Sequence, residues 1–407
     1  TLGRNKITGH SGSTITYTGG GETPNDNFGY FIQNDPKTLD LFGEWYLNPA
    51  SKKLQVFFGA SNPSSFNIKA SSLDTLLNSN YQSYINVTNL SFEGANSYAI
   101  YIRGGQNNTV SNCDIDFSGN NGVWAINNAN FRFESNSINH SNHSSLQVSC
   151  TNAVIRNNTI KNSAVIPGMA YESNGYNGIE LFGGDGTLVE YNDVDSVGGH
   201  GIFLRGNNVT IKNNLVNHFA YNLDDVGGIY TVGKFAGRKI IGNIVLNGIG
   251  SIAGTLSTIA GIKGIMMEVY SAFIEIRDNT IANAGVSGIH LNSSHDLIIR
   301  NNTSFNNRYQ ILSQGAATDP AEYTRNLSIY RNVFFSLAQT QITLDMWSVR
   351  DDVALFGTAD SNYYCRPIDD NLTILTSAAG VGASRSLASW QTYSGKDANS
   401  KKSPQTI

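Results

Sequence analysis

Three acidic residues lie beside two copies of a Gly-Ile pattern. Asp224 and Asp225 come just before Gly228-Ile229, and Glu268 ends the run that begins at Gly264-Ile265. If these runs are adjacent strands of one sheet, about 4.8 Å apart, the carboxyls of Asp225 and Glu268 can approach each other across it. Two carboxyls in an apolar-walled groove, one ionised and one kept protonated, can cleave a glycosidic bond. The plainer alternative is a pair of turn-capping aspartates and an unrelated exposed glutamate.

The elements that would position these carboxyls recur along the chain. Each unit has a Gly-Ile strand, a polar turn, and a second apolar-alternating strand that closes on Asn. A period in the low twenties with β-branched residues at alternate positions is typical of a parallel β-helix. We therefore expect an all-β chain, a right-handed parallel β-helix with inserted loops and an N-terminal hairpin and cap region. The first half of the unit is copied at Gly178-Leu181, Gly201-Leu204, Gly228-Thr231, Gly264-Met267 and Gly288-Leu291.

The closing asparagines give the register and locate the insertions. Their spacing is shortest in the bare coil, and three of the four long coils, 158–192, 214–243 and 243–279, lie close together in the stack. A solenoid carries its insertions on one face, often the binding face, so we expect function in the middle of the chain. The asparagines expected to stack at one turn are Asn112, Asn136, Asn158, Asn192, Asn214, Asn243, Asn279, Asn302 and Asn332.

The Gly-Ile strands also predict which side chains point outward. The first and third residues after each Gly are apolar in nearly every copy, so they should fill the core. The second residues should then form an outward column, in which aromatic residues could stack against sugar rings. The alternative is that the insertions fold over these aromatics and bury them as a satellite core. The column reads Tyr101, Trp124, Gln147, Glu180, Phe203, Tyr230, Met266 and His290.

Further residues near the two carboxyls could hold a substrate. Glu180 could bind a hydroxyl, and Arg205 with His200 could bind a carboxylate or sulfate. His290 is more typical of a solvated strand histidine than of a catalyst. We expect the substrate-binding residues to be Asp224, Tyr230, Glu180, Arg205, His200, Phe203, Trp124 and Glu172.

The ends of the chain depart from the coil pattern. We expect an N-terminal hairpin and cap region at 1–83, the β-helix at 84–365, and a C-terminal extension at 366–407. In the first region, 44–47 and 54–58 read as two antiparallel strands, and Leu73 to Leu77 as a short helical run. In the last, Ser386 to Gln391 reads as a short helix.

Composition excludes several classes of protein. A net charge of −4 with no basic stripe makes nucleic acid an unsuitable partner. The three cysteines have no metal-site spacing, so buried free thiols are expected. No apolar run approaches the roughly 20 residues that cross a bilayer, and residue 1 does not start a secretion signal. We expect a secreted, periplasmic or cell-surface protein of bacterial type that binds a carbohydrate polymer or oligosaccharide.

The central motif resembles a known group. The pattern Asp-x-Gly-Gly-Ile-Tyr-Thr at 225–231, an Ile-x-x-Asn strand ending at Asn243, and a later Gly-Ile-x-x-Glu ending at Glu268 are similar to bacterial right-handed β-helix glycoside hydrolases. Those families include activities on xylosides and fucosides. The resemblance covers roughly 84–365 and implies that Asp225 and Glu268 are the acid and nucleophile pair. The second position is Glu where Asp is usual, and Met266 replaces the usual Tyr.

Two other readings remain open. A polysaccharide lyase could use Asp224, Asp225, Glu172 and Glu268 as an oxygen-rich Ca²⁺ site, with Arg205 or Lys263 as the base. An adhesin or glycan-binding module could keep the groove without catalysis. The hydrolase requires no cofactor and no metal, because its two carboxyls do the chemistry.

Overall fold

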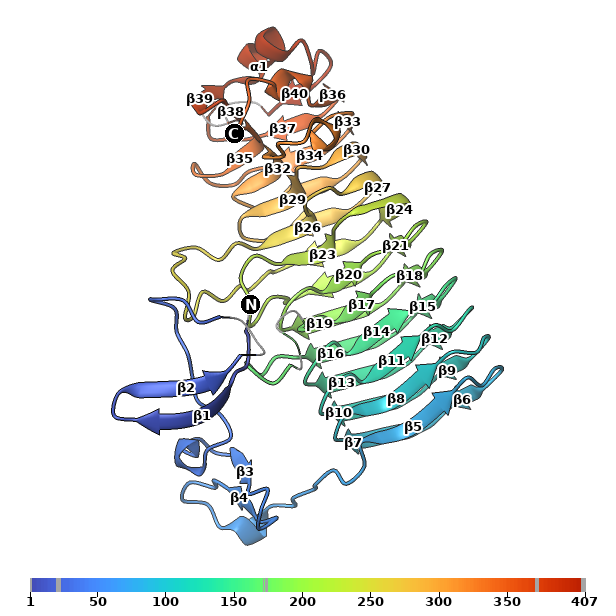
Figure 1. Cartoon of the computed structure of the whole chain (residues 1–407). Coiled ribbons are helices and arrows are strands. Elements are labelled where there is room, and N and C mark those ends of the chain that lie inside the picture. The colour runs from blue at the N-terminus through green and yellow to red at the C-terminus, as the bar shows by residue number, and fades with distance from the viewer. Residues whose placement is uncertain (1, 20–22, 171, 173–174, 370–372, 404–407) are drawn as a thin grey trace.

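The chain is wound into a stack of coils whose strands form three long sheets (Figure 1). This computed structural model describes residues 2–19, 23–170, 172, 175–369 and 373–403. Each coil contributes one strand to each sheet, and strands in neighbouring coils pair in parallel, except at β39. The fold is the parallel β-helix predicted from the repeats.

The Gly-Ile strands form one sheet, called the Gly-Ile sheet below. In chain order its strands are β5 (Thr75–Asn80), β8 (Tyr98–Arg103), β11 (Val123–Ile126), β14 (Leu146–Ser149), β17 (Ile179–Leu181), β20 (Ile202–Leu204), β23 (Gly227–Thr231), β26 (Lys263–Met267), β29 (Ser287–Asn292), β32 (Tyr309–Gly315), β35 (Ile342–Ser348), β38 (Ile374–Ala378) and β39 (Val381–Arg385).

The other two sheets close each coil. The second sheet holds β6 (Asn86–Thr88), β9 (Thr109–Ser111), β12 (Arg132–Glu134), β15 (Val154–Arg156), β18 (Leu188–Glu190), β21 (Thr210–Lys212), β24 (Lys234–Ile241), β27 (Ala272–Arg277), β30 (His295–Arg300), β33 (Leu327–Tyr330) and β36 (Gly357–Asp360). The third sheet holds β7 (Ser91–Ala95), β10 (Asp114–Ser118), β13 (Ser137–Ser141), β16 (Thr159–Ser163), β19 (Asp193–Val197), β22 (Leu215–Asn217), β25 (Ile244–Leu246), β28 (Thr280–Ala282), β31 (Thr303–Phe305), β34 (Val333–Phe335), β37 (Tyr363–Cys365) and β40 (Lys401–Lys402).

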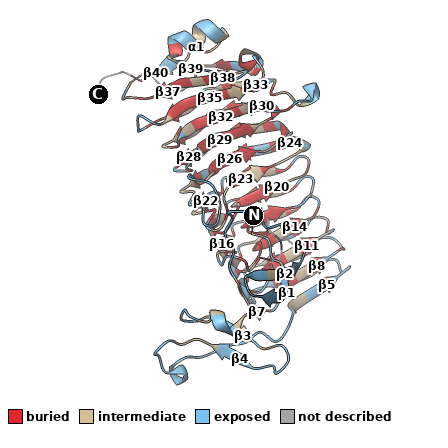
Figure 2. Cartoon of the chain, turned by 60° about the vertical axis from the view of Figure 1, so that its left-hand side comes forward, coloured by how far each residue is buried: buried red, intermediate tan, exposed pale blue. Residues whose placement is uncertain are grey.

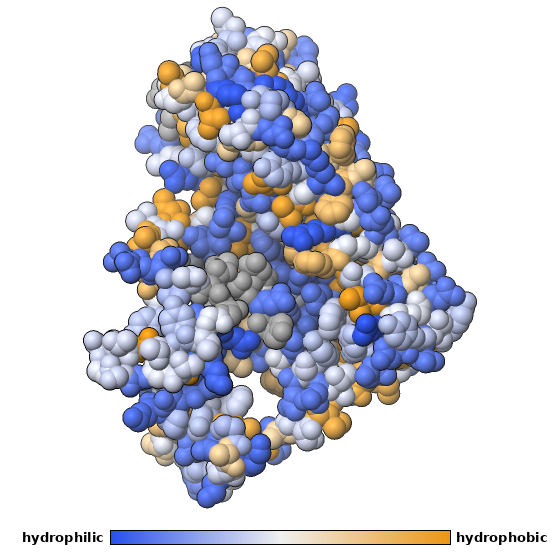
Figure 3. Space-filling view, in the orientation of Figure 1, coloured by the Kyte–Doolittle hydropathy of each residue, from blue (hydrophilic) through white to orange (hydrophobic). Residues whose placement is uncertain are grey.

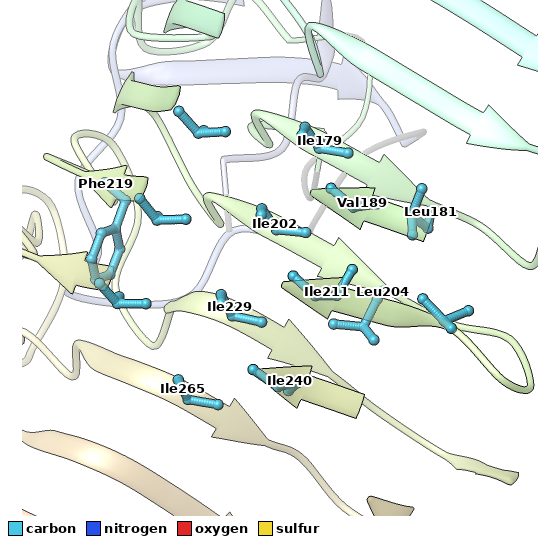
Figure 4. Packing of buried hydrophobic residues seen from close by; sticks show 14 of the residues in the cluster. Ile179, Leu181, Val189, Ile202, Leu204, Ile211, Phe219, Ile229, Ile240 and Ile265 are labelled. Atoms are coloured by element: carbon cyan, nitrogen blue, oxygen red, sulfur yellow. The ribbon is translucent and has the colours of Figure 1, made fainter. Parts of the chain in front are cut away.

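The core runs through the middle of the stack. Residues at the two predicted inward positions, such as Ile202, Leu204 and Ile229, are fully buried and meet the inward residues of the other sheets (Figure 4). Buried residues accordingly follow the strands from one end of the stack to the other (Figure 2). The polar exception, Thr231, is also fully buried, and its hydroxyl donates to the Leu204 carbonyl at 2.9 Å. The predicted inward positions are confirmed.

The repeated glycine has a steric cause. A Cβ added to Gly228 would lie 2.5 Å from Cγ1 of Val245, and one added to Gly264 would lie 2.2 Å from Cγ2 of Ile281. Real Cβ contacts are not that short, so in these two coils the corner between the third sheet and the Gly-Ile sheet has no room for a side chain.

A ladder of buried asparagines runs along one turn. The Asn192 backbone N–H and side-chain amide both donate to Oδ1 of Asn214, at 3.0 and 2.9 Å, and Asn214 repeats this toward Asn243. The same pattern joins every predicted position from Asn136 to Asn332 and continues to Asn362. Inside a solenoid these amides satisfy backbone groups that would otherwise be buried without partners.

The prediction for Asn112 is wrong by one residue. Cys113 occupies the ladder position, and its N–H donates to Oδ1 of Asn136 at 3.0 Å. Asn112 is exposed and has φ 52°, the left-handed conformation that the residue before each ladder position adopts, as in Asn213. Asn suits both positions, because it tolerates that conformation and also bonds to backbone groups.

The ends of the chain differ from the expected boundaries. The run Leu73 to Leu77 is not helical: β5 starts at Thr75 and pairs in parallel with β8, so the coils begin before residue 84. The predicted antiparallel hairpin is present as β3 (Trp45–Leu47) and β4 (Leu54–Val56), beyond the β5 end of the stack in Figure 1. A second hairpin, β1 (Lys6–Ser11) and β2 (Thr14–Thr18), was not predicted. Single 3₁₀ turns lie at Pro36–Thr38, Pro63–Ser65, Pro320–Glu322 and Val353–Leu355.

The C-terminal end is closed by helix α1 (Leu387–Ser394), which confirms the predicted short helix. Trp390 is fully buried, and its indole N–H donates to Oδ2 of Asp397 at 2.7 Å. Strands β38, β39 and β40 extend the sheets beyond residue 365. All three cysteines are buried and free, as expected. Among the described residues, no helix has the length and apolar character needed to span a bilayer.

Candidate functional site

The insertions line one edge of the Gly-Ile sheet. They connect the third sheet to it at 164–178, 218–226 and 247–262, so three of the four long coils carry their extra residues on one side. The fourth, 302–332, has its long connection at 316–326, between β32 and the second sheet. The outward surface of the Gly-Ile sheet, called the groove face below, is recessed beside the loops at the left of Figure 3. The N-terminal segment also reaches these loops, since the Gly29 N–H donates to the Gly254 carbonyl at 2.8 Å.

Asp225 stands at the edge of this face. It ends the 218–226 insertion with φ 58°, and its side chain is 73% exposed. Its carboxylate forms an ion pair with Lys263, the first residue of β26, whose side chain is only 8% exposed. Lys263 is directly opposite Gly227 in the register of β23 and β26. The ion pair therefore ties a loop carboxylate to the neighbouring strand.

Asp224 has a different task. Its Oδ1 accepts the N–H of Asp225 at 2.8 Å and also the N–H of Gly261. One carboxylate oxygen thus fastens the 218–226 insertion to the 247–262 insertion. This places Asp224 as the residue that holds the loop and leaves Asp225 as the one that faces the groove.

Glu268 follows β26 and projects from the groove face. Its N–H donates to the Thr231 carbonyl at 2.8 Å, which continues the pairing of β23 with β26. Its Oε1 accepts hydrogen bonds from the Asn292 side chain and, at 3.1 Å, from the Val269 N–H. Burial raises the pKa of Glu268, and the negative charge of Asp225 raises it further, against the opposing effects of these hydrogen bonds and of Lys263. The carboxyl is therefore held toward its protonated form.

Aromatic rings surround Tyr230, the outward residue between the two carboxyls. The His200 ring stacks on the Tyr230 ring with centroids 4.1 Å apart, and the Phe203 ring lies 5.1 Å from it. Burial, with the charge of Glu268, raises the pKa of Tyr230 to about 12, so its hydroxyl remains a donor. Burial lowers the pKa of His200 to about 4, and its Nδ1 accepts the Gly227 N–H at 3.1 Å. A neutral His200 orients Tyr230 and carries no positive charge toward an anion.

Phe203 is not the open sugar platform that we expected. It is only 8% exposed, because Tyr230, His200, Phe182 and the guanidinium of Arg205 pack around it. Arg205 lies over both phenyl rings, 4.8 Å from the Phe182 centroid and 5.0 Å from that of Phe203. The positive charge of Arg205 acts on two groups of the groove face, because it opposes the rise in the pKa of Glu180 and of Tyr230.

The two remaining glutamates lie further along the face. Glu180 is outward in register but only 6% exposed, because Ser144 donates to its Oε2 at 2.5 Å and Asn177 at 3.2 Å. Burial raises the pKa of Glu180, and the nearby charge of Glu172 adds to this effect. Glu172 itself is exposed in the 164–178 insertion.

Trp124 is outward and partly exposed, as predicted. Its ring lies 5.3 Å from that of Tyr98 and 5.0 Å from that of Tyr101, so the three form an aromatic cluster. In register it is four strands from Tyr230, through Gln147, Glu180 and Phe203. At about 4.8 Å per strand this is roughly 19 Å, so only an extended ligand could contact both.

The possible metal site finds no support in the geometry. No three His, Cys, Asp or Glu side chains gather as ligands would among the described residues, and these include Asp224, Asp225, Glu172 and Glu268. The oxygen-rich cluster considered for Ca²⁺ is therefore not assembled.

Two contributors were missed by the sequence reasoning. Asn292 lies opposite Glu268 when the pairing of Met267 with Leu291 is continued by one residue, so the register alone could have shown that it reaches that carboxyl. Lys263 was considered as a base but not as the partner of Asp225, because it precedes the Gly-Ile pattern. Together these residues create two carboxyls in different electrical surroundings, one paired with a cation and one buried and hydrogen-bonded.

Comparisons with known proteins agree with this architecture. A family model described as the right-handed β-helix region matches residues 64–166, 98–258 and 171–334, more than half of the chain. No curated protein matches the chain.

Among solved structures, an alginate lyase from Paenibacillus sp. is 14% identical and aligns over 63% of this chain and 87% of its own, with a TM-score of 0.47. The A-module of a mannuronan C-5 epimerase from Azotobacter vinelandii is 13% identical over 79% of this chain and 90% of its own, with a TM-score of 0.45. The catalytic domain of an α-1,3-glucanase is 14% identical over 78% of this chain and 53% of its own, with a TM-score of 0.39. Such distant similarity concerns shape and does not assign chemistry. By the family match, this chain belongs to the right-handed β-helix family.

Proposed function

We propose that the chain is a glycoside hydrolase that cleaves a polysaccharide or oligosaccharide lying along the groove face. The observation that carries this proposal is the contrast between Glu268, whose pKa burial and Asp225 raise, and Asp225, which is paired with Lys263. Glu268 is the general acid that protonates the glycosidic oxygen. Asp225 is the carboxylate that attacks the sugar or activates a water molecule.

The neighbouring residues hold the substrate in this proposal. Tyr230 donates a hydrogen bond from between the two carboxyls, and Arg205 binds an electron-rich group of the sugar. Trp124 packs against a sugar ring four strands from Tyr230. Glu172 and Glu180 contact hydroxyls of the sugars between them. A chain that contacts all of them is longer than one or two sugars, which favours a polymer or a long oligosaccharide. We expect such an enzyme to be secreted, periplasmic or on the cell surface.

The test uses near-isosteric substitutions of the two carboxyls. Glu268→Gln and Asp225→Asn should each lower turnover of the cleaved glycan by roughly 10² to 10⁴-fold. Glu268→Gln should keep the thermal midpoint, because this side chain does not belong to the core. Asp225→Asn should lower the midpoint, because it leaves the nearly covered Lys263 ammonium without its ion-pair partner, so its turnover is measured well below that midpoint. Glu275→Gln, on the outer side of the second sheet, is the matched control and should retain full activity. Asp224→Asn should be milder than Asp225→Asn, because the amide oxygen can still accept the two loop N–H groups.

Two outcomes would contradict the proposal. Near-wild-type turnover by both Glu268→Gln and Asp225→Asn would remove the carboxyl pair from the chemistry. A wild-type protein that binds a panel of glycans and cleaves none of them would instead be a non-catalytic glycan-binding β-helix.

A lyase that acts on an acidic polymer is the second candidate, and Lys263 favours it. Its amino group lies on the groove face beside Asp225. After giving up one proton to solvent it could take the proton of a uronate ring, while Arg205 binds the sugar carboxylate. Hydrolysis inserts one water molecule into the products, whereas elimination leaves a double bond and inserts none. Digestion in ¹⁸O-labelled water, read by mass spectrometry, separates the two. Label in the new chain end supports the hydrolase, and unlabelled products that absorb in the ultraviolet support the lyase.

A further inference from the structure

A further carboxyl on the groove face, that of Asp345, has no role in the chemistry above. Asp345 lies on β35 in the outward column, paired in register with Leu312 on β32 and Leu375 on β38. It is only 8% exposed, and none of the described residues forms a hydrogen bond or ion pair with its carboxyl group. A leucine at this position would simply continue the apolar column.

An unpartnered carboxyl at such a place is costly to the fold. Desolvation raises the pKa of Asp345 to about 7, against the opposing positive charge of Arg308. Arg308 is the charged group that acts on it, and its strand neighbours Leu312 and Leu375 are apolar. Near neutral pH the group therefore spends much of its time as a neutral acid, with an O–H to donate and no acceptor within the protein. Groups that break the local pattern without structural benefit are commonly retained for binding or catalysis.

The surroundings of Asp345 are those of a sugar site. Trp347, two residues later on the same strand, lies on the same face and is partly exposed. Its register neighbour Gln314 bonds through Oε1 to Nε2 of His290 at 2.9 Å, which fixes the amide beside the tryptophan. An aromatic ring next to oriented polar groups is the usual arrangement for a pyranose, which offers an apolar face and a rim of hydroxyls.

We propose that Asp345 and Trp347 form a second glycan-binding subsite, in which the Trp347 ring stacks on a pyranose and the Asp345 carboxyl donates to one of its hydroxyls. The strand β35 is three strands from β26, which Glu268 follows, through β29 and β32. At about 4.8 Å per strand the subsite is roughly 14 Å along the stack from Glu268. The inference rests on the proposed function, in which the glycan lies along the groove face. It predicts that the substrate is a chain of several sugars.

The test measures binding rather than turnover. In a Glu268→Gln background, calorimetry compares the trimer and hexamer of β-1,4-linked xylose, and the trimer and hexamer of mannuronate. The hexamer of at least one series should bind more tightly than its trimer. Adding Asp345→Leu should weaken hexamer binding roughly three- to tenfold, the usual effect of one lost hydrogen bond, and leave the trimer unchanged. Trp347→Ala should weaken the hexamer selectively as well.

Asp351→Leu is the matched control, because Asp351 is exposed in the loop after β35. It should change neither affinity. Asp345→Leu should also raise the thermal midpoint, so that a loss of binding cannot be assigned to unfolding. Equal affinity for trimer and hexamer in every series, or a hexamer affinity that Asp345→Leu leaves intact, would overturn the subsite. Selective hexamer binding by a protein that cleaves nothing would keep the subsite and overturn the hydrolase.

Discussion

Lys263 and Asp225 form an ion pair across two neighbouring coils, although 38 residues separate them in the chain. The lysine side chain is almost fully covered, while the aspartate is largely exposed. The positive charge therefore sits inside the groove face, close enough to lower the pKa of Glu268, while Asp225 raises it. The protonation of the candidate acid is thus set by a balance between two opposite charges.

Replacing Lys263 by Met should disturb that balance in a predictable direction. Loss of the positive charge removes an influence that favours ionised Glu268, so the pKa of Glu268 should rise. If Glu268 is the general acid, the alkaline limb of the kcat/KM profile should move to higher pH while the maximal rate falls. The measurement is the pH profile of glycan cleavage, with Lys239→Met on the second sheet as a control that should not shift the limb. A limb that moves to lower pH would mean that another group controls it.

Comparing equivalent positions in successive repeats could predict most of the fold. In a β-helix each strand pairs with the same strand of the next coil, so the repeat in the sequence gives the register. Ile202, Leu204 and Ile229 could be placed in the core by alternation alone, and Asn136 to Asn332 by their spacing. The error at Asn112 shows the limit of this method. Two adjacent positions of the turn both favour asparagine for different physical reasons, and composition does not distinguish them.

The site was harder to predict, because many of the contacts that define it come from strand ends and turns outside the repeated pattern. The burial of Phe203 depends on Arg205 and Phe182 at the following outward positions, and that of Glu180 on Ser144 and Asn177 in adjoining turns. Asp345 was missed for another reason. It lies on a strand without the Gly-Ile signature, so the outward column was not extended to it.

The asparagine ladder should contribute more to stability than any single surface residue. Asn214→Leu would remove the oxygen that accepts both the Asn192 backbone N–H and the Asn192 side-chain amide in a buried turn. Each such group costs about 1 to 3 kcal/mol, so the midpoint of urea unfolding should fall clearly. Asn213→Gly changes the preceding residue, which is exposed and left-handed, and should have little effect. Equal destabilisation by the two variants would argue against the ladder as the stabilising element.

The C-terminal end should detach when its buried carboxylate is removed. Asp397 is 1% exposed and accepts hydrogen bonds from the Trp390 indole, the Tyr364 hydroxyl at 3.1 Å and the Asn362 amide at 3.1 Å. Asp397→Ala leaves these three buried donors without an acceptor. Amide hydrogen exchange should therefore become faster in α1 and β40 and stay unchanged in β23 and β26. Asp360→Ala is the control, because water can replace the exposed contacts that its side chain makes with Asn399. Faster exchange throughout the stack would mean that the end does not unfold separately.

The free energy of unfolding should reveal Asp345 through its dependence on pH. The pKa of this carboxyl is about 7 in the folded chain against an ordinary value of 3.8, so the folded state holds its proton more tightly than the unfolded state. Below pH 3.8 Asp345 is protonated in both the folded and the unfolded chain, so its ionisation does not change the free energy of unfolding. As the pH rises toward 7 the unfolded state alone releases the proton, so the stability falls, and above pH 7 the loss is complete.

Asp345→Asn keeps the shape of the side chain and cannot ionise. Its stability relative to the wild type should therefore increase from about pH 4 to about pH 8, by up to about 4 kcal/mol. All other carboxyls contribute equally to both proteins, so the difference between the two unfolding curves isolates Asp345. Thermal midpoints measured across this pH range provide the test, and Asp351→Asn should follow the wild type at every pH. A difference that stays constant with pH would show that Asp345 ionises as readily in the fold as in the unfolded chain, and that it is not the buried neutral acid from which the second subsite is inferred.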